Sequence, residues 1–384
     1  MASILDNSIN KLEHLKIPFS DIQVATDNFS KTYEIEPSKY FTVYRAELDH
    51  FDIDDHSSVQ GQNKDRHAKR RNTVAIKRIK HKLNEVYFYN NIRMLSSVKH
   101  HNIVSLLGFC VNGSEMILVT ENVSNDHLDD YLGNFNLMHI LTWENRLKIC
   151  INVAHSLNYL HSTMEDQKMV IDSCIDRYNI WLDENLGVKI VESGMSVFLH
   201  QNENDEEFVQ EYEKLNKLQR ELDVYSFGKV LFEILCGKKN DDPIFLKNGD
   251  KGLVHVARQI FYWETLEKMI DPLIMENTSE NNLDLNRGAN KDSLNTFIKI
   301  AYDCIVETID QRPTMAVVVK QLEEALLFQK LRDKFIPKMK NGFSAPFGYI
   351  WFLRGGHCEE LDGFGKSEVP RRSSGSGGGA FFQG

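Results

Sequence analysis

The sequence lacks three signatures, each of which would assign it to a particular class of protein. Its 384 residues contain six cysteines but no CxxC pair, which argues against a zinc site or a disulfide framework and favours a reducing compartment. No run of 18 apolar residues is present, so no membrane-spanning segment is expected. With a formal net charge of -10, the chain has no basic excess that would favour a nucleic-acid partner.

Targeting signals are also missing at the start of the chain. Met1–Asn10 contains no basic segment followed by an apolar core, so a secretory signal peptide is not expected. Ala2 stands where N-myristoylation needs a glycine. We therefore expect a cytoplasmic protein that reaches the plasma membrane only through a partner. A fragment of a membrane receptor is the alternative that the sequence leaves open.

Hydrophobic patterning divides the chain into two parts. Before residue 123, alternating and β-branched runs predict strands, and apolar positions from Val86 to Leu95 predict one main helix. Phe19–Phe29 predicts a further short helix. After residue 123, the pattern predicts long helices over Leu141–His161, Asp223–Cys236, Leu253–Met269, Leu294–Val306 and Thr314–Phe335. This segregation of strands and helices predicts an α+β protein of two lobes.

The same patterns suggest domain boundaries. Residues 1–18 are an N-terminal extension, 19–122 a small β-rich lobe and 123–335 a larger helical lobe. Residues 50–72 are polar and are expected to form a mobile insert in the small lobe, whose basic stretch is a solvated loop rather than a binding patch. Residues 336–384 are rich in glycine and serine and are expected to be a disordered tail.

Six segments along the chain follow the order found in one protein family. They are FSDIQVATDNF at Phe19–Phe29, VAIK at Val74–Lys77, HHNIVSLLGFC at His100–Cys110, LTWENRLKICINVAHSLNYLH at Leu141–His161, DVYSFGKVLFEILCGK at Asp223–Lys238 and DQRPTM at Asp310–Met315. Together they resemble the protein kinase family, and specifically the cytoplasmic kinase domains of plant receptor-like kinases. The resemblance covers Phe19 to Leu331 and implies the bilobal kinase fold. Phosphoryl transfer by that fold needs a phosphate cradle, a lysine, metal-binding carboxylates and an acid that accepts a proton.

The phosphate cradle of the family is a glycine-rich loop, which here aligns with Ile35–Tyr44. The family's three glycines fall on Glu36, Ser38 and Phe41. Glycine lets the backbone approach phosphates closely, whereas a carboxylate repels a polyanion. The resemblance therefore places an impaired phosphate cradle at this loop.

Lys77 of the VAIK segment matches the family's phosphate-contacting lysine. In the family this lysine pairs with a glutamate of the next helix, and the alignment puts Asn91 at that position. An amide accepts a hydrogen bond but forms no ion pair. The simpler alternative for Lys77 is a lysine that extends from a strand into solvent.

The family's catalytic loop aligns with Asp172–Asn179, a polar stretch between two apolar runs. Cys174 falls on the catalytic aspartate and Asp176 on the lysine that follows it. A cysteine accepts a proton only as a thiolate, and the neighbouring acids disfavour that form. The same acids argue against a nucleophilic cysteine enzyme, so no intact catalytic residue is expected.

The family's metal site is changed at one of its two positions. Asn179 is retained, and Glu192 of ESG replaces the DFG aspartate. The longer side chain displaces the carboxylate by about 1.5 Å, one carbon–carbon bond. We expect a degenerate metal site from these two residues. Three further matches are structural: Glu211 and its buried ion-pair partner Arg312, and Asp223, which braces the catalytic loop in the family.

The resemblance also implies a nucleotide pocket lined by Val43, Ala75, Lys77, Thr120 and Trp181. Trp181 stands where the family has a leucine beneath the adenine ring. An indole buries on the order of 200 Å², so on the adenine side it fills the space of the base and holds the lobes together without ATP. The alternative is a Trp181 side chain that points into the core of the large lobe.

These substitutions predict a pseudokinase, a kinase-fold signalling scaffold or allosteric regulator with a protein partner. The expected partner is an active receptor-like kinase, and no cofactor is expected. One alternative is a weakly active Ser/Thr protein kinase that uses ATP and Mg²⁺. A decaying copy without a role is the other alternative.

Overall fold

The computed structural model describes residues 12–37, 41–51, 69–80, 85–123, 126–166, 169–171, 175–191, 196–198, 206–246, 252–262, 269–275 and 288–340. The chain divides into two compact units, residues 1–333 and 334–384. The described part of the second unit is the end of helix α11. Most of the predicted insert lies outside the described residues, and so does the predicted tail from residue 341 onward. Residues 336–340, the first part of the predicted tail, instead form the end of helix α11.

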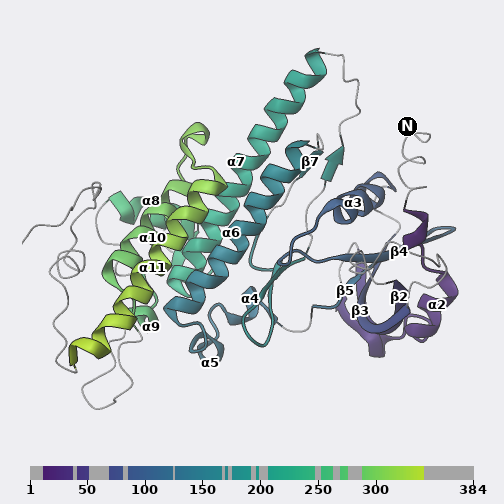
Figure 1. Cartoon of the computed structure of the whole chain (residues 1–384), viewed down its shortest axis with the longest axis horizontal. Coiled ribbons are helices and arrows are strands. Elements are labelled where there is room, and N and C mark those ends of the chain that lie inside the picture. The colour runs from purple at the N-terminus through teal and green to yellow at the C-terminus, as the bar shows by residue number, and fades with distance from the viewer. Residues whose placement is uncertain are drawn as a thin grey trace, which may run out of the picture. The chain divides into compact units, whose positions relative to one another are not determined.

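The small lobe contains a five-stranded antiparallel sheet with the strand order β1-β2-β3-β5-β4 (Figure 1). Its strands are β1 (Glu34–Pro37), β2 (Phe41–Phe51), β3 (Lys69–Ile79), β4 (Leu106–Asn112) and β5 (Glu115–Glu121). β2 and β3 continue into both ends of the predicted insert, so these ends are paired strand and not loop. Side-chain alternation along β3 buries Val74 and Ile76 on one face and places Ala75 and Lys77 on the other.

Helices cover both faces of this sheet. α2 (Phe19–Ala25) packs the fully buried Ile22 on one face, and α3 (Glu85–Ser97) packs Phe88 and Ile92 on the other. α2 ends before the predicted helix does, because the chain then enters the left-handed region, with φ values of 46°, 53° and 61° over three consecutive residues. The apolar spacing of both helices thus accounts for the layers of the small lobe.

The large lobe is helical and carries two small sheets. Its helices are α4 (Leu128–Tyr131), α5 (Phe135–Met138), α6 (Trp143–Asp166), α7 (Glu206–Cys236), α8 (Leu253–Tyr262), α9 (Pro272–Met275), α10 (Lys291–Cys304) and α11 (Met315–Lys340). Its short 3-10 helices are η4 (Pro243–Phe245) and η7 (Ile309–Gln311), and two more, η1 (Glu13–Leu15) and η2 (Lys31–Tyr33), lie beside the small-lobe sheet. The strands are β6 (Asp126–His127), β8 (Ile180–Leu182) and β9 (Val188–Ile190) in one sheet, and β7 (Met169–Ile171) and β10 (Ser196–Phe198) in the other. A sheet lobe followed by a helical lobe confirms the predicted α+β architecture.

The core of the large lobe lies around α6 and α7, which run side by side (Figure 1). Leu147 and Leu157 of α6 are fully buried, as are Phe227 and Leu231 of α7. Apolar residues recur on one side of each helix at the spacing of helical turns, so the two helices bury a shared apolar seam. This core supports β8, which borders the space between the lobes.

The helix boundaries that differ most from the prediction are those of α7 and α8. α7 begins at Glu206, well before the predicted start at Asp223. Lysine, glutamate, glutamine, arginine and leucine dominate the added segment, and all five are good helix formers. α8 ends at Tyr262 rather than Met269, and residues 263–268 lie outside the described part of the chain.

Candidate functional site

A pocket between the lobes is surrounded by all five residues that were predicted to line it. Val43, Ala75, Lys77 and Thr120 line it from the small lobe, and Trp181 lines it from the large lobe. The sheet register explains the convergence from the small lobe, because Val43 pairs with Lys77 and Ala75 with Thr120. Residues distant in sequence therefore meet at one site.

The cavity at the centre of this pocket is small. Its volume is about 60 Å³, whereas ligand pockets commonly measure roughly 300–1,000 Å³ and one water occupies about 30 Å³ of the liquid. The other lining residues are Ile35, Glu36, Leu95, Val104, Leu118, Glu121, Asn122, Val123 and Val191. The space is therefore well below that of a common ligand pocket.

Trp181 closes the floor of the pocket. The flanking residues of β8, Ile180 and Leu182, are fully buried in the core of the large lobe, and Trp181 lies half-buried on the opposite face of the strand. Its indole packs on the ring of His127, with centroids 3.9 Å apart, as a cross-strand pair between β8 and β6. The alternative in which Trp181 points into the core of the large lobe is therefore wrong.

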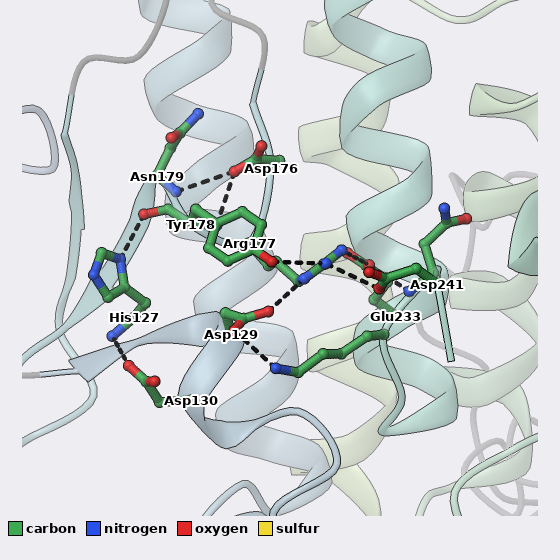
Figure 2. Close-up of polar contacts among 11 residues, drawn as sticks. His127, Asp129, Asp130, Asp176, Arg177, Tyr178, Asn179, Glu233 and Asp241 are labelled. Carbon is green, nitrogen blue, oxygen red and sulfur yellow. Dashed lines mark hydrogen bonds and ion pairs between the residues drawn. The ribbon is translucent and has the colours of Figure 1, made fainter. Parts of the chain in front are cut away.

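Two hydrogen bonds hold His127 in place. Its Nδ1 lies 2.6 Å from the carbonyl oxygen of Tyr178 (Figure 2). A carbonyl can only accept, so Nδ1 carries the proton and donates this bond. The backbone N–H of His127 donates to Asp130 Oδ2 at 2.9 Å. The ring that supports Trp181 is thus oriented by contacts on two sides.

Lys77 contacts an aromatic ring that occupies the place of a family glycine. Its Nζ lies 4.3 Å from the centroid of the Phe41 ring, a cation–π arrangement. Glu36, at the position of another family glycine, lines the same cavity. Ser38, at the third, lies outside the described residues. Phe41 and Glu36 therefore place an aromatic ring and a carboxylate at positions where phosphate binding needs glycine and an accessible backbone.

Asn91 lies on α3, at the position where the family pairs a glutamate with the lysine. Its side chain is fully buried, and within the described part of the chain neither Oδ1 nor Nδ2 has a hydrogen-bond partner. An unsatisfied buried polar group costs about 1–3 kcal/mol. Leu95, one turn further along α3, lines the pocket. The helix thus presents an unsatisfied amide in an apolar setting, on the side of the helix that borders the pocket.

The catalytic-loop region is described only from Ile175 onward, so Cys174, Asp172 and Ser173 lie outside the described residues. Asp176 folds back on its own turn, where its Oδ1 accepts from the backbone N–H of Tyr178 at 2.8 Å and of Asn179 at 3.2 Å (Figure 2). It therefore acts as a turn-forming residue.

Of the two predicted metal ligands, the structure describes only one. Asn179 is largely buried, and its carbonyl accepts from the N–H of Val191 at 2.9 Å. Glu192, the other predicted ligand, lies outside the described residues together with Ser193 and Gly194. Among the residues that are described, no three histidine, cysteine, aspartate or glutamate side chains gather as a metal site. The degenerate metal site stays a prediction.

Arg177 is the residue of this region whose role sequence reasoning missed. Its Nε lies 2.5 Å from Asp129 Oδ1, and its Nη1 lies 2.7 Å from Glu233 Oε1. Its Nη2 lies 3.0 Å from Asp241 Oδ1 (Figure 2). The partners are 48, 56 and 64 residues away in sequence. No local sequence pattern predicts such a network. The sequence indicated only that an arginine lies in a polar stretch belonging to the site.

Burial and charge shape the pKa values in this network. Burial opposes the charge of Arg177, but the hydrogen bond to Asp129 and the attraction of Glu233 outweigh it and raise the pKa of Arg177. Burial favours the neutral acid at Asp129, yet Lys239 and Arg177 hold the pKa of Asp129 below its usual value. Glu233 is the most deeply buried acid of this network, and its burial raises its pKa despite the N–H of Asn240 and the Arg177 charge.

The three predicted structural residues have separate surroundings. Asp223 is buried, and its Oδ2 lies 2.9 Å from His161 Nε2 on α6. Arg312 is half-buried and donates to the carbonyl oxygens of Val306 at 3.1 Å and Glu221 at 2.9 Å. Glu211 lies on α7, but its side chain is outside those described, so its ion pair with Arg312 stays a prediction. The role of Asp223 as a brace for residues 172–174 also stays a prediction.

Comparison with known proteins gives the context of this site. Residues 56–322 match the family described as protein tyrosine and serine/threonine kinase. A protein named as a probable receptor-like protein kinase of Arabidopsis thaliana is 33% identical over 331 residues, 82% of this chain and 35% of that protein. Receptor-like protein kinase HERK 1 of the same plant is 31% identical over 340 residues, 84% of this chain and 36% of that protein.

A third relative is cysteine-rich receptor-like protein kinase 41 of Arabidopsis thaliana, 28% identical over 335 residues, 82% of this chain and 44% of that protein. The chain thus spans less than half the length of each of these relatives. In the part of the chain that the structure describes, no helix combines the length and the apolar character needed to cross a membrane.

Proposed function

Because this chain belongs to the family of protein tyrosine and serine/threonine kinases, we propose that it is a kinase-fold pseudoenzyme that regulates an active partner kinase by binding to it. The observation that carries the proposal is the closed pocket. Where the resemblance places a nucleotide, Trp181 and the facing sheet leave a cavity of about 60 Å³. The indole replaces packing that a bound nucleotide would supply, so the two lobes are held together without a ligand.

The small-lobe side of the pocket supports the same proposal. A polyphosphate needs backbone N–H groups and an exposed ammonium. Here Lys77 is turned to the ring of Phe41, and Glu36 adds negative charge to the lining. Asn91 supplies no charge that would draw the lysine towards α3. Each change acts against phosphate binding at a different point.

The catalytic loop adds an argument from sequence. Cys174 occupies the position of the general base, and loss of a general base costs on the order of 10²–10⁴-fold in rate. Displacement of a metal ligand by about 1 Å costs on the order of 10²-fold. From turnover of roughly 1–100 per second in active kinases, little phosphoryl transfer would survive these changes.

ATP and Mg²⁺ are the groups that the family implies, and the residues of the pocket do not fit them. The cavity is too small for adenine, and Glu36 lines it beside Lys77. We therefore propose that the chain needs neither group for its function. The proposed partner is a protein, an active receptor-like kinase, and the proposed location is the cytoplasm, at the plasma membrane through that partner.

A nucleotide titration tests the proposal. ATP is titrated with and without Mg²⁺ while the melting temperature and the tryptophan fluorescence are recorded. The parent chain is expected to bind with millimolar affinity or not at all. Trp181→Leu, which restores the family residue and opens the floor of the pocket, is expected to gain affinity.

The matched control is Trp181→Phe, which keeps an aromatic ring against His127 and should gain less than the leucine variant. Micromolar ATP binding by the parent chain would overturn the proposal and favour a weakly active Ser/Thr protein kinase. A Trp181→Leu variant that stays folded and gains no affinity would show that the indole does not keep the nucleotide out.

A further inference from the structure

The first half of α7 carries an apolar stripe that is partly exposed to solvent. In Figure 1 this half of the helix extends beyond the neighbouring end of α6. Leu215, Leu218 and Leu222 on it are 39%, 40% and 42% exposed. We name these three residues the α7 stripe. Isolated exposed leucines are common, but three on one helix face form a continuous surface.

The stripe lies on the side of α7 that faces away from the large lobe. Further along the helix, Val224, Phe227 and Leu231 are buried and mark the side that packs into the core. With 3.6 residues per turn, the positions of the α7 stripe fall on the opposite side. Their spacing of three and then four residues is the spacing by which two helices pack along a narrow apolar seam.

We propose that two copies of this chain associate through the α7 stripe, with the helices antiparallel and the two-fold axis at Leu218. In that arrangement Leu218 packs on Leu218 of the second copy. Leu215 packs on Leu222 of the second copy, and on the other side of the axis Leu222 packs on Leu215 of the second copy. A two-fold interface uses the same patch on both chains, so a single stripe is sufficient.

Charge decides the direction of the helices. Lys214 and Glu221 are seven residues apart and therefore lie on the same flank of the stripe, one near each end. In an antiparallel pair, this flank of one helix lies against the same flank of the other helix. Lys214 therefore faces Glu221 of the second copy, and Glu221 faces Lys214 of the second copy. In a parallel pair, this flank would instead meet the uncharged flank of Gln219. Opposite charges are therefore matched only in the antiparallel pair.

The two charged side chains differ in exposure. Lys214 is exposed, whereas the Glu221 side chain is 17% exposed and must turn away from Lys217 to make this contact. Lys217 is the basic neighbour of Glu221, at 3.9 Å, but it pairs more closely with Asp310, at 2.7 Å. Three leucines and two ion pairs bury less than the roughly 1,000 Å² that a stable interface needs. We therefore expect a reversible dimer of micromolar affinity.

Sedimentation velocity of the full chain, from low micromolar to several hundred micromolar concentration, tests the proposal. The parent is expected to shift from monomer to dimer across this range. Leu218→Glu places two carboxylates at the axis and should weaken association on the order of tenfold or more. Leu327→Glu, the same change at a 52% exposed leucine of α11, is the matched control and should leave association unchanged.

A mixing experiment tests the antiparallel direction. Lys214→Glu and Glu221→Lys should each weaken self-association, by about two- to fivefold. An equimolar mixture of the two variants pairs opposite charges at both contacts, so it should associate at least as strongly as the parent. Circular dichroism checks that each variant keeps its helix content.

Three outcomes would overturn the proposal. The first is a parent chain that stays monomeric at the highest concentration. The second is a dimer that Leu218→Glu leaves intact. The third is a mixture of the two charge variants that associates no better than either variant alone, which would exclude the antiparallel contact. None of these measurements involves a nucleotide, so they stand apart from the test of the closed pocket.

Discussion

Arg177 and Glu233 form a buried ion pair, with Nη1 of the arginine 2.7 Å from Oε1 of the glutamate. The arginine belongs to the turn that follows the predicted catalytic position, and the glutamate belongs to α7, the central helix of the large lobe. Glu233 Oε1 also accepts from the N–H of Asn240 at 2.7 Å. The pair therefore joins the turn beneath the pocket to the core.

Removing the arginine should strongly destabilise the protein. In Arg177→Ala, Glu233 stays buried without its partner, and breaking a buried pair in this way costs about 3–5 kcal/mol. Equilibrium denaturation by urea measures the free energy of unfolding. Lys217→Ala, which removes an exposed pair with Asp310, is the control and should leave the transition nearly unchanged. Equal transitions for the two variants would contradict the structural role of Arg177.

The ionisation of Asp129 should make the stability of the folded protein depend on pH in the acid range. Its folded-state pKa is lowered from 3.8, so its contribution is present above that pH and is lost as the pH falls through the folded value. The melting temperature of the parent should drop more between about pH 5 and about pH 3 than that of Asp129→Asn.

Glu233 has a raised pKa and acts in the opposite direction, but both chains contain it, so the difference between them isolates Asp129. Parallel melting curves for the parent and the variant over this range would count against the lowered pKa. The measurement needs only thermal melts in a series of buffers of constant ionic strength.

Asn91→Leu should stabilise the protein. The substitution removes an unsatisfied buried amide and fills nearly the same volume with carbon, so a gain of about 1–3 kcal/mol is expected. Asn102→Leu is the comparison, because Asn102 Nδ2 donates to the carbonyl of Val188 at 2.8 Å and this bond would be lost, although Asn102 Oδ1 has no partner among the described residues. The first variant should melt higher than the parent and the second lower. A lower melting temperature for Asn91→Leu would mean that the amide has a stabilising contact.

The purified chain should neither phosphorylate itself nor transfer phosphate to generic protein substrates. The reason is the combination of Cys174 at the general-base position with the closed pocket. Incorporation of radiolabel from ATP is measured for the parent and for Lys77→Ala, and both should stay at background. Incorporation by the parent that Lys77→Ala abolishes would demonstrate genuine phosphoryl transfer and refute the prediction.

Much of the fold could be predicted because its signals are local. The β-branched run around Val74 predicted a strand, and helical spacing predicted α6 and α10. The kinase family and the relation to plant receptor-like kinases, inferred from six segments, are confirmed by the comparisons. The side of Trp181 was left open by the sequence, since period-two alternation places it opposite Ile180 and Leu182 but does not say which face of β8 borders the pocket.

Other features depend on contacts that local sequence does not record. The Arg177 network joins residues from α4, α7 and the segment after α7, and no spacing rule relates them. The early start of α7 was missed because the family pattern, rather than helix propensity, set the expected boundary. The unsatisfied amide of Asn91 could not be foreseen either, since burial of a polar side chain is decided by packing of the whole lobe.

α7 is one uninterrupted helix of 31 residues, about 46 Å in length. Leu218 lies in its first half, and Glu233, which pairs with Arg177 in the turn beneath the pocket, lies near its other end. The exposed leucines and the glutamate that pairs with Arg177 therefore belong to one continuous helix, so the proposed interface and the turn beneath the pocket are attached to the same element.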